Sequence, residues 1–386
     1  MAPRFIIQDN ATIRETRDDS PTRPRKRQRT DSTVDIGAYS LAECVLPMGP
    51  VEDDPEFYRD NDPNARCYLR IGTTRFKVDG SLLAEASPVL QNLLADHPFD
   101  GQCPDKPLVV IANAEEFRAL LWALYASPQE RAAQPRDHSD LDRLLLIAII
   151  STHYRCASLA PWAKQALLHT LASGTLIASC SSAHFTRLLD CATRTHNPAL
   201  LESTITHWAA RLRAGSAPCI PAILAADAHE LPRLRGVAYY WHLQTMAEAQ
   251  DAAGLNARGA TQFQSDPKLS NVQLVRLLSG HWSLVNLWER MRRAPPTFEC
   301  QVACKGRRCA VVWGERWRVA VASEKVSGIG SASVLALLAA MRELLAGDRE
   351  LVGNFPAQCR LAALEAMKNQ VKAFEDGLED HFFGCV

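Results

Sequence analysis

Three closely spaced cysteines are the residues whose types and spacing best suit chemistry in this chain. Cys300, Cys304 and Cys309 are separated by steps of four and five residues. Thiolates at such spacings can bind one zinc ion, which takes four nitrogen or sulfur ligands in a tetrahedron. The fourth ligand would be Cys359 or His381, neither of which completes a recognised zinc-finger spacing. The spacing of these cysteines therefore allows a zinc site but does not match a known zinc-binding motif.

The opposing interpretation is that these cysteines simply pack. No Cys-x-x-Cys pair occurs in the sequence, and free cysteine is often buried as a small hydrophobe. Lys305, Arg307 and Arg308 lie nearby and would favour the thiolate form of a neighbouring cysteine, which would make it reactive. We expect packed thiols with no bound metal or cofactor. The alternative is a metal- or redox-dependent module built on Cys300–Cys309.

Familiar catalytic motifs are absent from the sequence. It contains no Gly-x-Ser-x-Gly elbow, no phosphate-binding Walker loop and no His-Glu-x-x-His helix. Gly328-Ile329-Gly330 lacks the third glycine of a dinucleotide-binding turn, and we interpret it as a loop. His229 and His381 have no partners at metal-binding spacing. The sequence therefore predicts a protein that is not an enzyme and has no catalytic residues.

A basic run lies near the N-terminus. Five cations fall within seven residues: Arg23, Arg25, Lys26, Arg27 and Arg29. Such a run predicts a nuclear localisation signal, and the alternative is a solvated basic stretch. No aromatic side chain is interleaved to stack on bases, so specific nucleic-acid recognition is not expected.

The region that carries this run, residues 1–55, is rich in Pro, Ser, Thr, Asp and Arg and has little apolar periodicity. Such a composition cannot offset the entropy cost of ordering, so we expect a disordered tail.

Length and composition limit the remaining classes. A chain of 386 residues predicts two or three units. Its 43 basic and 43 acidic residues balance, which argues against general attraction to nucleic acid or membranes. The longest apolar run, Leu144–Ile150, is far shorter than the ~20 residues that span a bilayer. Met1–Asn10 is not a secretory signal. Twelve scattered cysteines do not form a disulfide framework. We expect a soluble, reduced, nuclear and/or cytoplasmic protein.

The densest local pattern lies between residues 66 and 126. Apolar and polar residues alternate in Cys67–Ile71 and again in Arg75–Val78, with Gly72 in the turn between them. This period of two predicts two half-buried strands joined as a hairpin.

Helical signals follow the hairpin. Ser81–Ala86 predicts one or two helical turns, and Ser87 caps a second helix that has proline at its first position. Leu108–Ile111 predicts a fully buried strand. Asn113 and Glu116 form a capping box before a third helix. The expected order is hairpin, two short helices, strand, helix.

This order and its residues resemble a BTB/POZ domain, in the form found in a large group of fungal BTB proteins. The resemblance rests on Leu69-Arg70-Ile71-Gly72, Phe76-Lys77-Val78, Leu82-Leu83-Ala84, Ser87-Pro88-Val89-Leu90, Glu115–Leu121 and the run Leu120–Ala126. It covers about a sixth of the chain. It implies an interaction module that binds protein partners, often as a homodimer, without chemistry of its own. Some BTB families are adaptors that bind a cullin scaffold, but this chain has no kelch, MATH or zinc-finger domain to present a substrate.

The resemblance also concerns dimer formation. Many BTB domains carry an aspartate and a basic residue at positions that Arg66 and Gly80 occupy here, so that pair is missing. An Arg66–Asp79 contact would replace it with the signs exchanged, contributing ~1 kcal/mol or less. A dimer would therefore depend on apolar burial. The adjacent Leu82 and Leu83 in the first helix are the predicted dimer contact.

The remainder of the chain reads as helical. A polar linker is expected over 128–140, followed by a helix that is apolar nearly all round. Cys309, Trp313 and Trp317 lie four apart and favour a helix, with a hairpin as the alternative. Two amphipathic helices, Ser331–Ala346 and Pro356–Phe383, close the chain. The predicted fold class is α+β, divided as follows: disordered basic tail 1–55, BTB/POZ α/β domain 56–172, helical region 173–266 and C-terminal helical region 267–386.

Overall fold

The computed structural model describes residues 50–59, 62–133, 135, 137–253, 266–300 and 307–383. The chain divides into two compact units, Met1–Pro47 and Met48–Val386, and every described residue belongs to the second. The basic run from Arg23 to Arg29 and Cys304 lie outside the described residues.

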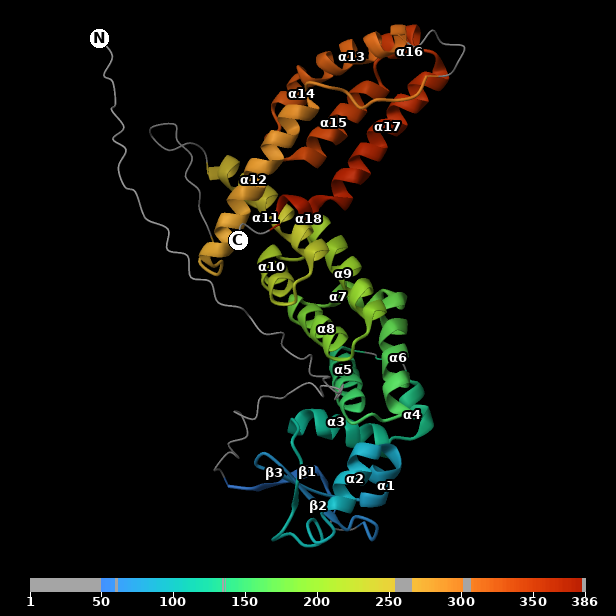
Figure 1. Ribbon diagram of the computed structural model, residues 1–386, viewed down its shortest axis with the longest axis vertical. Coiled ribbons are helices and arrows are strands. Elements are labelled where there is room, and N and C mark those ends of the chain that lie inside the picture. The colour runs from blue at the N-terminus through green and yellow to red at the C-terminus, as the bar shows by residue number, and fades with distance from the viewer. Residues whose placement is uncertain are drawn as a thin grey trace, which may run out of the picture. The chain divides into compact units, whose positions relative to one another are not determined.

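A small mixed sheet forms the first part of this unit (Figure 1). Its strands are β1 (Glu52–Tyr58), β2 (Cys67–Ile71), β3 (Thr74–Val78) and β4 (Leu108–Val109), in the order β1-β3-β2-β4. Strands β2 and β3 form the expected antiparallel hairpin, in which Leu69 lies opposite Phe76. β4 runs parallel to β2, and β1 runs parallel to β3.

Three helices complete this α/β part: α1 (Gly80–Ala86), α2 (Pro88–Asp96) and α3 (Ala114–Tyr125). The Ser87 hydroxyl caps α2 by accepting a hydrogen bond from the Leu90 N–H at 3.1 Å. Phe76 and Phe117 meet edge to face in the core, with ring centroids 5.5 Å apart. The expected order of hairpin, two short helices, strand and helix is confirmed.

Strand β1 corrects the predicted tail, since it begins at Glu52, inside the range 1–55. Its sequence is mostly charged and shows no alternation of apolar and polar residues, so no local pattern predicts a strand there. Its order comes from Asp54, whose buried carboxylate accepts hydrogen bonds from the Glu56 and Phe57 N–H groups and pairs with Arg118. These contacts, the pairing to β3 and the burial of Phe57 hold a strand whose other residues are mostly polar.

Two local predictions around α3 are also corrected. Leu108–Ile111 was expected to be a fully buried strand, but β4 is an edge strand, and Val109 and Ile111 are 43% and 65% exposed. Asn113 caps α3 as expected, accepting from the Glu115 N–H at 2.8 Å. Glu116 does not close a capping box; its carboxylate instead pairs with Arg194 at 2.9 Å.

A run of packed helices follows the α/β part. Their bounds are α4 (Pro128–Ala132), α5 (His138–His153), α6 (Leu159–Ser173), α7 (Thr175–Ser179), α8 (Ser182–Arg194), α9 (Pro198–Arg213), α10 (Cys219–Ala228) and α11 (Pro232–Ala253). Helix α4 lies in the expected linker 128–140, where Ser127 and Glu130 form a capping box. Helix α5 contacts α3, α6 and α8, which explains why it is apolar nearly all round.

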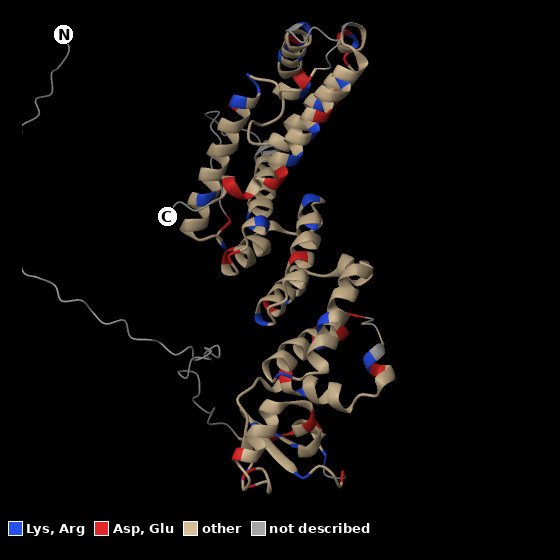
Figure 2. Ribbon diagram, turned by 45° about the vertical axis from the view of Figure 1, so that its right-hand side comes forward, with Lys and Arg blue, Asp and Glu red and all other residues tan. Residues whose placement is uncertain are grey.

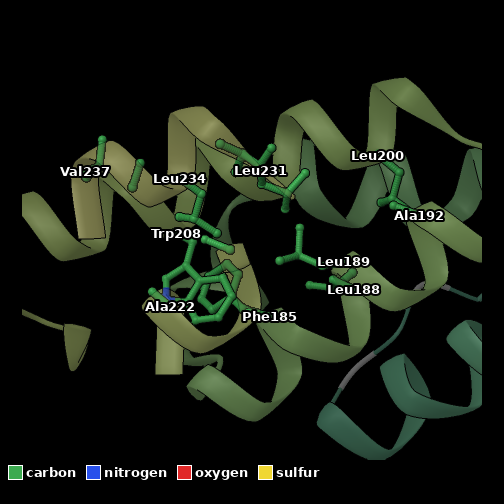
Figure 3. Close-up of a cluster of buried hydrophobic side chains, with 14 of the residues drawn as sticks. Phe185, Leu188, Leu189, Ala192, Leu200, Trp208, Ala222, Leu231, Leu234 and Val237 are labelled. Atoms are coloured by element: carbon green, nitrogen blue, oxygen red, sulfur yellow. The ribbon is translucent and has the colours of Figure 1, made fainter. Parts of the chain in front are cut away.

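Large apolar side chains from α8, α9, α10 and α11 share one core (Figure 3). Phe185 on α8 stacks on Trp208 of α9 with ring centroids 5.3 Å apart. Leu188, Leu189 and Leu234 surround this pair and are wholly buried. The helical spacing of these residues therefore reflects core packing, as their sequence pattern indicates.

The last helices are α12 (Asn271–Met291), α13 (Arg307–Val321), α14 (Glu324–Ser327), α15 (Val334–Ala346), α16 (Arg349–Asn354), α17 (Ala357–Asp376) and α18 (Leu378–His381). Cys309, Trp313 and Trp317 are buried along α13, so the helix is confirmed over the hairpin. The helix expected over Pro356–Phe383 is divided at Gly377 into α17 and α18.

The segment around α18 packs closely against α11 and α12. A side chain at Gly236 would place its Cβ 2.6 Å from the Glu379 backbone nitrogen, and one at Gly280 would lie 2.1 Å from the Phe382 ring. Phe382 is completely buried and stacks on Tyr239 with ring centroids 5.5 Å apart. The two glycines therefore form a notch that admits α18 and Phe382.

A polar centre ties α12 to α10 and α11. The Asp227 carboxylate accepts hydrogen bonds from Arg235 and Arg276 at 2.7 Å and from Tyr239 and Gln273 at 2.9 Å. Both arginines are more than four-fifths buried. One carboxylate thus pairs with two largely buried cations from different helices.

The described residues form an α+β fold in which helix predominates. No described helix has both the length and the apolar character to cross a membrane. Acidic and basic residues are interspersed along the helices (Figure 2), in keeping with the zero net charge.

Candidate functional site

The structure brings together three of the cysteines considered above. The ligand atoms of Cys300, Cys309 and Cys359 all lie within 4.8 Å of one another. Cys309 and Cys359 are buried, whereas Cys300 is half-buried. They come from the segment after α12, from α13 and from α17 respectively. We call these three residues the thiol cluster.

Aromatic packing positions the thiol cluster. Phe298 contacts the rings of Trp313 and Phe355 edge to face, with centroids 6.2 and 5.7 Å away. The Trp313 indole N–H donates to the Pro296 carbonyl at 3.1 Å, which fixes the segment carrying Cys300 against α13. The cluster is therefore set into a packed part of the fold.

The structure distinguishes the two candidates for a further zinc ligand. Cys359 joins the cluster, but His381 does not: its Nδ1 lies 2.8 Å from the Ser283 hydroxyl. Burial lowers the pKa of His381 below its usual 6.5. Three thiols within this distance can bind a thiophilic metal such as zinc, or two of them can form a disulfide under oxidation.

A second group of metal-ligating side chains was not found from the sequence. His138, Cys180 and His184 each offer a ligand atom, and these atoms lie within 4.8 Å of one another. His138 opens α5, Cys180 follows α7, and His184 lies in the first turn of α8. We call these three residues the imidazole–thiol cluster. It appears only when three helix ends meet, and a spacing of 42 residues between His138 and Cys180 gives no usable signal.

The geometry of the imidazole–thiol cluster is well defined. The two imidazole rings stack with centroids 4.3 Å apart and an interplanar angle of 25°. His138 Nδ1 lies 4.0 Å from the Cys180 sulfur, and its Nε2 lies 3.2 Å from the Ser179 hydroxyl. His184 Nδ1 lies 2.8 Å from the Ser181 hydroxyl and accepts from the Ser181 N–H, which closes a capping box.

The predicted dimer contact needs correction at one of its two residues. Leu83 is 1% exposed and belongs to the core of the α/β part, so its side chain cannot form a surface contact. Leu82 is half-buried and remains available. Arg66 and Asp79 have other partners: Arg66 Nε donates to the Pro63 carbonyl, and the Asp79 carboxylate caps α1 by accepting from Ser81. The expected Arg66–Asp79 contact is not among the contacts of these two residues within one chain.

An apolar row is exposed along α12. Val272, Val275, Leu278 and Trp282 lie on one side of the helix and are 49–69% exposed, while Leu277, Leu284 and Trp288 are buried on the other side. Exposed apolar rows of this kind are typical of surfaces that contact other proteins. The helical spacing of these four residues predicts an apolar face that packs in the core, but the structure exposes that face.

The helical part of the fold also contains two cavities. A cavity of about 220 Å³ lies among α3, α4, α5 and α6, where the Arg143 guanidinium covers the Trp122 ring at 4.8 Å. Another of about 300 Å³ lies between α9, α11 and the α17–α18 segment. Ligand pockets usually have volumes of about 300–1,000 Å³, so the first is small for a cofactor.

No family model, curated protein or solved structure matches this chain in the comparisons with known proteins.

Proposed function

We propose that this chain is a non-enzymatic protein-interaction protein whose α/β part is a BTB/POZ domain. The observation that carries the proposal is the order and pairing of the elements. The β2–β3 hairpin is followed by two short helices and by β4, which returns parallel to β2 beside it, and α3 follows. These are the elements that the resemblance implies, formed by the residues on which it rests.

Surface properties support the same class of function. The exposed row on α12 and the exposed Val109 and Ile111 at the edge strand present apolar side chains without an enclosed pocket. Extended apolar surface suits contact with another protein better than capture of a small molecule.

The proposed homodimer contact is now Leu82 alone. Light scattering coupled to size exclusion at micromolar concentrations should show a dimer for the wild type and a monomer for Leu82→Asp. Gln91→Asp, an exposed change on neighbouring α2, is the matched control and should remain dimeric. A wild-type monomer would refute the dimer, and a dimer that persists in folded Leu82→Asp would place the contact elsewhere.

Nuclear import is proposed from the basic run. Replacement of Arg23, Arg25, Lys26, Arg27 and Arg29 with alanine in a fluorescent fusion should abolish nuclear accumulation. Unchanged localisation would contradict the signal.

A cullin scaffold is the partner class that the resemblance adds. Calorimetric titration of the full chain with a purified cullin amino-terminal domain tests that interaction directly, and no heat of binding at micromolar concentrations would exclude the adaptor role.

A metal- or redox-dependent module at the thiol cluster is the second candidate function. The observation that favours it is the convergence of Cys300, Cys309 and Cys359 from three segments. Metal analysis of purified protein distinguishes the two interpretations. About one zinc per chain that is lost in Cys359→Ala, with melting of the region after Leu269 on chelation, would support the module. Retention of structure in a chelator would support packed thiols.

A further inference from the structure

We propose that the imidazole–thiol cluster is a binding site for a divalent zinc-type cation, with His138, Cys180 and His184 as protein ligands. The three ligand atoms already lie within 4.8 Å of one another, so binding requires them to approach and the two stacked imidazole rings to turn their nitrogens toward one point. Two imidazoles and one thiolate match the mixed nitrogen and sulfur ligand sets that zinc accepts. This proposal departs from the sequence-based expectation that the chain binds no metal.

Asp142 is an outer partner of this set of ligands. It lies one helical turn after His138 on α5, and its charge acts on both Cys180 and His184. Its Oδ1 is buried and has no hydrogen-bond partner, whereas its Oδ2 accepts from Arg187. A buried carboxylate oxygen without a donor is costly, and a cation beside it would remove that cost.

The thiolate offsets part of the charge of the cation. A divalent cation bound by one thiolate and two neutral imidazoles carries one positive charge, and the carboxylate of Asp142, which also pairs with Arg187, partly offsets it, so a partly buried site tolerates the group better than an isolated ion.

The protonation states agree with this arrangement. Burial lowers the pKa of His184, which keeps its imidazole neutral, and burial raises the pKa of Cys180, which keeps it a thiol until a cation displaces the proton. The Arg211 guanidinium, which donates to the Cys180 carbonyl, favours the thiolate. Binding should therefore release a proton from Cys180.

A purely structural role is the competing explanation, because His184 closes a capping box with Ser181. Glutamine performs that same capping role at the third helical position. The variant His184→Gln therefore keeps the cap and removes the imidazole ligand. Cys180→Ser removes the thiolate, and Cys156→Ala is the matched control because Cys156 is equally buried but belongs to neither cluster.

The experiment is titration of the reduced, metal-free full chain with CoCl₂, followed by competition with ZnCl₂. Absorption by the thiolate-to-cobalt transition and by tetrahedral cobalt reports ligation. We expect His184→Gln to weaken affinity at this site by about 100-fold or more, since even an outer partner typically contributes about 10- to 100-fold. Asp142→Asn should weaken the affinity for cobalt at this site by about 10-fold or more. Cys180→Ser should lose the charge-transfer absorption of one equivalent, and Cys156→Ala should match the wild type.

Two results would overturn the proposal. One is a cobalt titration in which wild type and His184→Gln are indistinguishable. The other is loss of all bound cobalt in Cys359→Ala, because that result would assign binding to the thiol cluster alone. One equivalent lost in His184→Gln but retained in Cys359→Ala supports the imidazole–thiol site independently of any metal at the thiol cluster.

Discussion

Substitution of Gly280 by alanine tests the close packing between α12 and Phe382. Two effects oppose one another. Alanine is about 1 kcal/mol more favourable than glycine within a helix. Its Cβ would lie 2.1 Å from the Phe382 ring, which is fully buried and held by stacking on Tyr239. Overpacking of this kind typically costs about 1–3 kcal/mol, and the short contact favours the upper end. We expect a net loss of about 1–2 kcal/mol.

The same substitution should reverse its sign when the ring is removed. Phe382→Ala alone should cost about 3–5 kcal/mol. In that background Gly280→Ala no longer meets the ring and should stabilise the chain by about 1 kcal/mol through helix propensity. The coupling between the two positions is then about 2–3 kcal/mol, at the high end for residues in contact.

Urea unfolding followed by far-ultraviolet circular dichroism measures all four members of this cycle. Gly314→Ala in α13 is the matched control, because nothing lies within 4 Å of its added Cβ, and it should stabilise by about 1 kcal/mol. Additive effects of Gly280→Ala and Phe382→Ala would refute the notch. A Gly280→Ala variant as stable as Gly314→Ala would refute it as well.

Three further outcomes follow from the structure. Asp227→Ala should lower the free energy of unfolding by about 3 kcal/mol, because it leaves two buried arginines without their shared carboxylate; urea unfolding measures this. Burial holds the folded pKa of His381 below 6.5, so the unfolded chain takes up the proton first and the free energy of unfolding falls as pH drops below 6.5. His381→Gln should reduce the fall in the urea midpoint between about pH 7.5 and about pH 5.5 without removing it, because burial also lowers the pKa of His153 and His242. Exposed Cys103 should react with iodoacetamide well before Cys191, whose pKa burial raises to about 12, as peptide mass spectrometry would show.

Local patterns predicted the elements but not their long-range partners. The alternation in Cys67–Ile71 and the Asn113 cap were read correctly because each depends on neighbours in the chain. Glu116 was assigned to a capping box because its true partner, Arg194, lies 78 residues away. Strand β1 was missed because its order comes from pairing and from Asp54 rather than from its own composition.

The candidate sites show the same division. Cys300 and Cys309 are close in sequence, so their spacing indicates a possible site, whereas the sequence leaves Cys359 and His381 as equal options for the remaining ligand. His138 carried no signal, since its relation to Cys180 and His184 exists only where the ends of α5, α7 and α8 meet. Residue type could suggest that ligands are present, but only the fold shows which of them meet.

The notch at Gly236 and Gly280 has a mechanical consequence. Leu378 and Gly236 lie in contact although about 140 residues separate them in the sequence, so the chain from α12 to α17 forms a loop whose two ends are fastened at one place. Tension applied beyond Phe382 would reach this fastening first and peel α18 away from α11. The ring would then leave its stack on Tyr239, and the contacts of Leu335 and Phe374 with Tyr240 would bear load next. The contact between α18 and α11 is thus the first that such a pull would load.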